Sequence, residues 1–434
     1  MTMSIAITDG GGGASATLIA LAVIVLTAVV CGRVAQKVGQ PKVLGEMVGG
    51  VLLGPSVFGA LAPKIQGGIF TPEVAPILSG LGEVGLTLYM FLVGVRFDHG
   101  RASHGSRALP FAAVAAGSLA PIAFGATAAY LFALGELPTG ISQFQYVLFV
   151  GGALSVTAFP MLASMLEERR MSSARFGSLA TFIAAGDDAI AWCFLALIVS
   201  MGAGTYDSGL LTLGLTAVFI AACALFIPRL LRRVIARTSE AQNMSDAVLG
   251  LLVVIALTAG SITNLIGVYS VFGASVAGAF VPYDSRFAEL ARVRLMVPVG
   301  AIFLPVFFSS SGLKTDLGAV LSTDALSVLG VLLFVGFASK LLPVYGVMRA
   351  FGWARGPSLA MGGLMNARGL MILIFIGVGS ELGILNDVMF SSFVVVAILT
   401  TATAMPLYRT HFKNDVEEEE RQRSEPHIDV TPRT

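Results

Sequence analysis

Hydrophobic positions run through the chain in long stretches separated by short polar segments. Apolar stretches of about 20 residues recur from end to end, and that length crosses roughly 30 Å of hydrocarbon as a helix. The pattern predicts an all-α polytopic membrane protein with about thirteen transmembrane helices. Their approximate limits are 16–34, 42–60, 75–95, 108–134, 145–166, 174–202, 209–231, 245–264, 267–282, 296–313, 325–348, 357–379 and 386–408.

Basic residues alternate between the loops that join these segments. The even-numbered loops carry almost none beyond Lys64 and Lys314. The odd-numbered loops carry clusters: Arg33, Lys37 and Lys42; Arg96, Arg101 and Arg107; Arg169, Arg170 and Arg175; Arg229, Arg232, Arg233 and Arg237; Arg286, Arg292 and Arg294; Arg349 and Arg355. Cytoplasmic loops are rich in lysine and arginine. The alternation therefore predicts an N-terminus outside the cell and a C-terminus in the cytoplasm.

Composition supports a bilayer as the surroundings of this chain. Hydrophobic residues make up 56% of it and charged residues 12%, against about 25% charged in a soluble domain. The net charge is +1, so nothing indicates a nucleic-acid partner. The three cysteines lie singly in apolar runs without metal or disulfide spacing, and no cofactor is predicted. Neither a histidine pair nor a nucleophilic serine motif occurs, so no enzymatic activity is expected.

The number of segments and two interruptions predict an internal repeat. Thirteen spans with opposite-facing termini allow six helices, a linking helix at 209–231, and six more in inverted orientation. The fifth span contains the residues Ser155 to Pro160, and the twelfth contains Gly362 and Gly363 followed by Asn366 to Gly369. Glycine or proline clusters in corresponding spans indicate broken helices that line a site. The alternative is an ordinary kink in each helix.

Two adjacent aspartates, Asp187 and Asp188, occupy the middle of the sixth span. They follow Arg175 by about 12 residues, which places them ~18 Å along a helix. A charge at the bilayer centre costs roughly 2.5–3.5 kcal/mol, so such residues are functional candidates. Adjacent positions point about 100° apart on a helix. One carboxylate can therefore face a fixed cation while the other faces a water-filled cavity, where a proton and a metal cation compete for it.

Three further charged residues lie inside predicted spans. Lys340 is a candidate salt-bridge partner for Asp187, and the alternative is that its side chain reaches the membrane surface. Arg368 could neutralise the C-terminal ends of broken half-helices or pair with Glu83. A structural role is expected for Arg368, and a packing or interface role for Glu83.

The chain resembles the second family of monovalent cation:proton antiporters, the Kef-type and plant cation/proton exchanger group. The matching segments are QPKVLGEMVGGVLLGPSVFG at Gln40, LGEVGLTLYMFLVGVRFD at Leu81, SVTAFPMLASMLEE at Ser155, GDDAIAW at Gly186, LPVFFSSSGLKTDL at Leu304, ASKLLP at Ala338 and LMNARGLMILI at Leu364. The double aspartate resembles bacterial sodium/proton antiporters that are thought to exchange two protons per cation, whereas many Kef-type and plant members carry glutamine or asparagine before the aspartate.

The resemblance implies a fold with a dimerisation part, at about 16–95 and 245–313, and a core part, at about 108–202 and 325–408. The core would hold two crossed, broken helices, and 209–231 would link the parts. The transmembrane domain would cover 1–412, and the acidic run after it predicts a disordered cytoplasmic tail at 413–434. Relatives are usually homodimers, so a homodimer in the plasma membrane is expected.

The resemblance also implies roles for individual residues. Asp188 resembles the aspartate that binds the transported cation or proton, and Asp187 the residue paired with the core lysine, here Lys340. Ser155 and Thr157 fall where the family supplies polar ligands, and Asn366 and Arg368 match its NxRG motif.

The leading hypothesis is a secondary active antiporter that exchanges sodium or potassium ions for protons by alternating access. With two protons per cation, exchange would move one net charge per cycle and respond to the membrane potential. A potassium efflux channel and a proton-coupled exporter of an organic solute are the alternatives. A channel is disfavoured because the chain lacks a carbonyl filter segment such as TVGYG.

Overall fold

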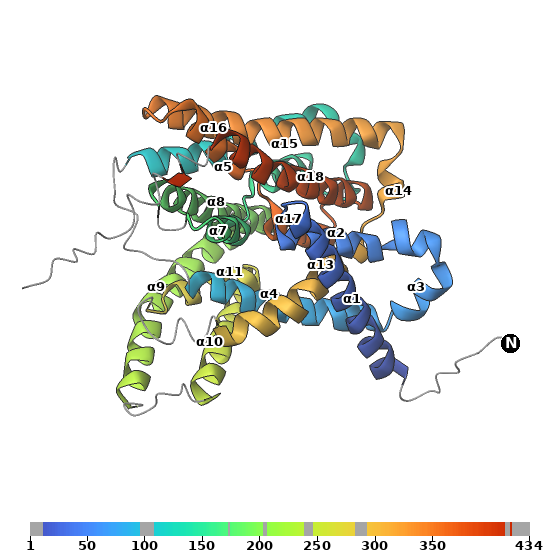
Figure 1. The fold of residues 1–434 in the computed structure, drawn as a ribbon, viewed down its shortest axis with the longest axis horizontal. Helices are drawn as coiled ribbons and strands as arrows, with labels where there is room; N and C mark the ends of the chain where they lie inside the picture. The colour runs from blue at the N-terminus through green and yellow to red at the C-terminus, as the bar shows by residue number, and fades with distance from the viewer. Residues whose placement is uncertain are drawn as a thin grey trace, which may run out of the picture.

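Every regular element that the computed structural model describes is helical (Figure 1). The structure describes residues 12–95, 108–171, 174–202, 206–237, 246–282, 293–412 and 417–418. The helices of the first half are α1 (Gly12–Lys37), α2 (Lys42–Leu53), α3 (Pro63–Ile69), α4 (Val74–Val95), α5 (Ala108–Phe132), α6 (Gln143–Ser155), α7 (Phe159–Glu168), α8 (Arg175–Gly202) and α9 (Tyr206–Arg237). Those of the second half are α10 (Asp246–Ile266), α11 (Ser270–Ala279), α13 (Leu304–Leu313), α14 (Leu317–Val320), α15 (Thr323–Ala350), α16 (Arg355–Leu364), α17 (Gly369–Glu381) and α18 (Asp387–His411). Short π- or 3-10-helical turns lie at Pro55–Gly59, Leu134–Glu136 and Val299–Phe303.

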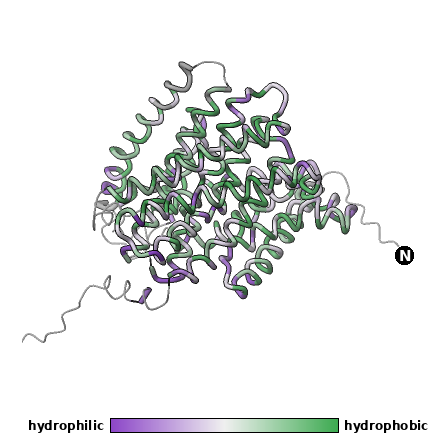
Figure 2. The backbone as a smooth tube through the Cα atoms, turned by 90° about the horizontal axis from the view of Figure 1, so that it is seen from above, coloured by the Kyte–Doolittle hydropathy of each residue, from purple (hydrophilic) through white to green (hydrophobic). Residues whose placement is uncertain are grey.

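Eleven helical segments among the described residues are long and apolar enough to cross a membrane. Figure 2 shows hydrophobic residues along most of the helical turns and hydrophilic residues gathered at many helix ends. The chain is therefore a multi-pass membrane protein. The spans predicted at 42–60 and 267–282 contain the shorter helices α2 and α11, so the number thirteen and the inverted repeat remain predictions.

The helices form two groups, which also meet where α2 contacts α17 and α18. In the upper part of Figure 1, α5 packs against α6 and α15, and α16 packs against α18. In the lower part, α4 packs against α10, α11 and α13. The approach of α4 to α11 is so close that a Cβ atom on Gly278 would collide with the carbonyl group of Phe91.

Both predicted interruptions break a helix. The fifth span divides into α6 and α7 around the extended residues Val156 to Ala158, and Pro160 lies in the first turn of α7, where its missing N–H group costs no hydrogen bond. The twelfth span divides into α16 and α17, which Asn366 and Arg368 separate.

The predicted tail at 413–434 is described only at Glu417 and Glu418. There the Glu417 side chain is 1% exposed and its Oε2 atom lies 2.6 Å from Nη2 of Arg169, just after α7. At this position the structure therefore differs from the predicted solvated run, because the cationic partner compensates the burial of the carboxylate. The remainder of the tail lies outside the described residues.

Candidate functional site

The two broken helices cross at their interrupted segments. The backbone N–H group of Ala158 donates to the carbonyl oxygen of Ala367 across 2.7 Å. Gly369 begins α17 with φ at 40° and lies against the sulfur of Met161. A left-handed backbone conformation and a close neighbour both favour glycine at this point. The crossing therefore brings four half-helix ends to one buried place.

Arg368 is fully buried at this crossing. Its guanidinium group donates to the carbonyl oxygens of Leu154, Val156 and Gly336; Leu154 lies in the last turn of α6 and Val156 directly follows this helix. A cation there offsets the partial negative charge of a helix C-terminus. The sequence left two alternatives for Arg368, a half-helix C-terminus or a pair with Glu83, and its guanidinium group lies at the half-helix end. Glu83 instead accepts a hydrogen bond from the hydroxyl group of Ser270, 3.2 Å away.

Asp187 accepts hydrogen bonds from three side chains that come from three different elements. Lys340 on α15 places its Nζ atom 2.6 Å from Oδ2, and both side chains are 0% exposed. The hydroxyl group of Thr157, between α6 and α7, lies 2.9 Å from the same oxygen. The hydroxyl group of Ser118 on α5 lies 2.7 Å from Oδ1. Charge-assisted hydrogen bonds of this kind are the stronger ones in proteins, so Asp187 is fully compensated where it lies.

The other predicted polar residues divide between the site and the helix backbone. Thr157 also lies within 3.1 Å of the carbonyl oxygen of Met365, so its single hydrogen can serve either acceptor. Ser155 donates to the carbonyl oxygen of Gly152 in its own helix, which does not bring it to the aspartates. Asn366 donates to Gly362, and within the described chain its buried Oδ1 atom has no hydrogen-bond partner.

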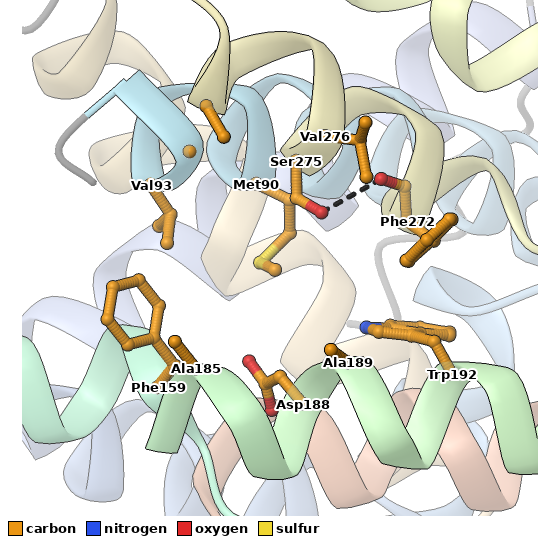
Figure 3. A pocket seen from close by; sticks show the side chains of 12 residues that line it. Met90, Val93, Phe159, Ala185, Asp188, Ala189, Trp192, Phe272, Ser275 and Val276 are labelled. Carbon is orange, nitrogen blue, oxygen red and sulfur yellow. Dashed lines mark hydrogen bonds between the residues drawn. The ribbon is translucent and has the colours of Figure 1, made fainter. Parts of the chain in front are cut away.

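Asp188 points away from this network, as expected from its position next to Asp187 on α8. Its Oδ1 atom is buried and has no hydrogen-bond partner among the described residues, and the backbone N–H group of Phe159 bonds the carboxylate. The side chain lines a cavity of about 200 Å³, which we call the Asp188 cavity. Figure 3 shows the carboxylate projecting from α8 towards Met90 and Ser275, which come from α4 and α11. The two adjacent carboxylates therefore have different surroundings, one closed and one at a cavity.

Sequence reasoning missed Ser118 and the wall of the cavity opposite Asp188. A single serine in an apolar span gives no signal, because hydroxyl groups are common in membrane helices and bond to the backbone. Among the described residues, no group of three or more His, Cys, Asp and Glu side chains could hold a metal ion.

The fold and the buried charges define a polytopic membrane protein built around crossed, broken helices. Residues 23–409 match the transmembrane domain of the sodium/hydrogen exchangers. The chain belongs to this sodium/hydrogen exchanger family.

The chain is similar to relatives from plants, cyanobacteria and yeast. It is 31% identical to cation/H(+) antiporter 18 of Arabidopsis thaliana over 90% of this chain and 48% of that protein. It is 31% identical to the Na(+)/H(+) antiporter NhaS4 of Synechocystis sp. over 89% of this chain and 94% of that protein. It is 29% identical to K(+)/H(+) antiporter 1 of Saccharomyces cerevisiae over 85% of this chain and 43% of that protein. The chain thus spans about half the length of the plant and yeast relatives and most of the cyanobacterial one.

The fold is also found among solved structures. The sodium proton antiporter MjNhaP1 from Methanocaldococcus jannaschii at pH 8 superposes with a TM-score of 0.60 over 94% of this chain and 99% of that chain. The two sequences are 12% identical, so the comparison concerns the fold alone.

Proposed function

We propose that this protein is a secondary active antiporter that exchanges sodium or potassium ions for protons across the membrane. The observation that carries the proposal is the unpaired Oδ1 atom of Asp188 at a cavity, beside a neighbour whose charge is already compensated. A buried carboxylate oxygen without a partner is costly. A proton or a monovalent cation each removes that cost, so the two compete for one group. The names of the relatives, which include both sodium and potassium antiporters, support the same exchange.

The surrounding residues support different parts of this mechanism. Asp187 and Lys340 form the fixed pair, and Thr157 lies between that pair and the helix crossing. Arg368 holds the crossing together by satisfying the carbonyl groups of the broken helix. The Asp188 cavity lies between α8 on one side and α4 and α11 on the other. Alternating access then requires that α8 move relative to α4 and α11.

The wider organisation belongs to the same proposal. The dimerisation part comprises about 16–95 and 245–313, the core part about 108–202 and 325–408, and 209–231 links them. The packing of α4 with α10, α11 and α13, and of α5 with α6 and α15, supports this division. The working unit is a homodimer in the plasma membrane, with the N-terminus outside and the C-terminus in the cytoplasm. The alternation of basic residues along the loops supports that orientation.

The Asp188 cavity is small for an organic solute. Its volume is about 200 Å³, whereas pockets for small organic molecules usually measure roughly 300–1,000 Å³. A monovalent cation with part of its water shell needs far less space. The cavity therefore favours an ion over the organic solute that the sequence left as an alternative.

The test is exchange by the purified full chain in acidified liposomes that contain a pH-sensitive dye. Sodium and potassium ions are added in turn to wild type, to Asp188→Asn and to Asp324→Asn. Asp324 is an exposed aspartate in the first turn of α15 and serves as the matched control. We expect a cation-dependent rise of internal pH in wild type and in the control, and none in Asp188→Asn. Exchange that survives Asp188→Asn would remove this residue as the carrier.

A further inference from the structure

A second cavity lies beyond the Asp188 cavity, on the other side of one tryptophan. Its volume is about 230 Å³, and its lining includes the carboxylate-bearing residue Glu381 at the end of α17 and Asn264 near the end of α10. We call it the Glu381 cavity. Trp192 on α8 lines both cavities. The two cavities therefore adjoin each other at the Trp192 side chain.

Trp192 packs against two aromatic rings from the start of α11. Its ring stacks on that of Tyr269 with the centroids 6.3 Å apart and the planes 7° from parallel. The ring of Phe272 lies 6.5 Å away at 51°. Trp192 itself is 4% exposed. The three rings form a continuous apolar contact between α8 and α11. Figure 3 shows two of them, Trp192 and Phe272.

This contact sits one helical turn from Asp188. Residues four apart lie on the same face of a helix, so Trp192 covers the face of α8 that carries the Asp188 carboxylate. Trp192, Asp188, Phe272 and Ser275 all line the Asp188 cavity. The aromatic contact thus closes that cavity at the end nearest the Glu381 cavity.

The Asp188 cavity extends along α11 from Phe272 to the last residue, whereas the Glu381 cavity reaches only the residues just before this helix. Tyr269 precedes this ten-residue helix and lines the Glu381 cavity, whereas Ala279, its last residue, lines the Asp188 cavity. Val93 and Gly94, close to the end of α4, also line the Asp188 cavity. The Asp188 cavity thus reaches the ends of α4 and α11, and the Glu381 cavity the ends of α10 and α17, so we expect the two cavities to open on opposite sides of the membrane.

We propose that the stacked pair Trp192 and Tyr269 is the gate that seals the Asp188 cavity from the Glu381 cavity. The proposal rests on the exchange function proposed above. Coupled exchange fails if protons reach Asp188 from both sides at once. An apolar constriction excludes water and hydrated ions, and two stacked rings between α8 and α11 supply one. The stack must part in each cycle, so that the carboxylate loses contact with one side before it meets the other.

The first experiment measures from which side each cavity can be reached. In a background without Cys31, Cys193 and Cys223, Ser275→Cys reports on the Asp188 cavity and Asn264→Cys on the Glu381 cavity. A membrane-impermeant thiol reagent is applied to one side of the reconstituted membrane at a time, at alkaline pH and without sodium or potassium ions, so that Asp188 carries neither substrate and the exchange cycle does not run. We expect the two cysteines to react from opposite sides. Reaction of Ser275→Cys from both sides, with the aromatic pair intact, would overturn the proposal.

The second experiment removes the gate. Trp192→Ala should make Ser275→Cys reactive from both sides and raise the cation-independent proton leak under an imposed potential by roughly tenfold, because the constriction no longer excludes water. Trp192→Phe keeps a ring and should leave both readings unchanged. If Trp192→Ala does not fold, Tyr269→Ala removes the other half of the stack. A folded alanine variant with one-sided labelling and the wild-type leak would show that these rings are packing only.

A third variant separates this proposal from the proposed function. Trp192→Ala combined with Asp188→Asn should still leak, because the gate acts on water and not through the carboxylate. If exchange survives in Asp188→Asn alone, the assignment of the carrier fails, but the sidedness of labelling still tests the gate. If Asp188→Asn loses exchange as expected but labelling is two-sided with Trp192 and Tyr269 intact, the gate proposal is refuted and Asp188 is retained as the carrier residue.

Discussion

The buried pair of Asp187 and Lys340 offers the most direct test of how this site is held. Lys340→Met removes the ammonium group and keeps an unbranched apolar side chain of similar length. The Oδ2 atom of Asp187 then loses a partner at 2.6 Å in a place where neither side chain is exposed. Ser118 and Thr157 remain as donors to the carboxylate. The variant therefore leaves a buried negative charge with two hydroxyl groups as its only side-chain donors among the described residues.

Removal of one partner from a buried pair typically destabilises a protein by about 3–5 kcal/mol. The two remaining hydroxyl donors place the expected loss near the lower end, at about 3 kcal/mol, which is roughly a hundredfold in the folding equilibrium. Replacing both charges, in Asp187→Asn with Lys340→Met, removes the uncompensated charge as well. The double variant should therefore regain most of the lost stability.

The assay is heat unfolding of the purified protein in one detergent and lipid mixture, followed by the fraction that stays monodisperse. Lys314→Met is the matched control, because Lys314 is an exposed lysine at the end of α13. We expect the order control, double variant, Lys340→Met, from most to least stable. A Lys340→Met protein as stable as the control, or a double variant no better than the single one, would refute the charge-compensation argument.

Two further changes test the crossing and the closed carboxylate. Gly369→Ala should lower stability by about 1–2 kcal/mol, because φ at 40° disfavours a side chain and the new Cβ would press on Met161. Gly377→Ala in the same helix has no neighbour within 4 Å of its Cβ and should be neutral or stabilising by up to about 1 kcal/mol; equal unfolding temperatures for the two would contradict this. Ser118→Ala should cost about 1–3 kcal/mol, because Asp187 loses a donor to a charged oxygen, and unchanged heat unfolding would count against that.

The sequence predicted those features of the site that stand out against an apolar background. A charge inside a span is costly, so Asp187, Asp188 and Lys340 were visible without a structure. The two interruptions were visible because each places a cluster of glycine, proline and polar residues within a predicted span. Ser118 was not, since nothing in its span distinguishes a serine that bonds a carboxylate from one that bonds its own helix.

The ends of the helices and the positions of the cavities could not be predicted from the sequence, because they depend on packing between segments. Hydropathy runs past the point where a helix stops: α2 ends at Leu53, although the apolar stretch continues through Pro55. The contact of Trp192 with Tyr269 depends on how α8 packs against α11, and these helices are far apart in the chain. Periodicity within one segment carries no information on such a pairing.

The difference between the two adjacent aspartates bears on how many protons the proposed exchange requires. Asp187, Asp188, Lys340 and Arg368 sum to zero charge when all four are ionised. A proton or a monovalent cation on Asp188 gives this buried cluster the same charge of +1, so exchange at Asp188 alone moves no net charge. An electrogenic cycle with two protons per cation therefore needs a second proton acceptor. The geometry leaves that role to the pair of Asp187 and Lys340, which are joined at 2.6 Å and enclosed by hydroxyl donors. We therefore propose that the stoichiometry depends on whether the cation separates Asp187 from Lys340 and releases the lysine proton, and not on Asp188 alone.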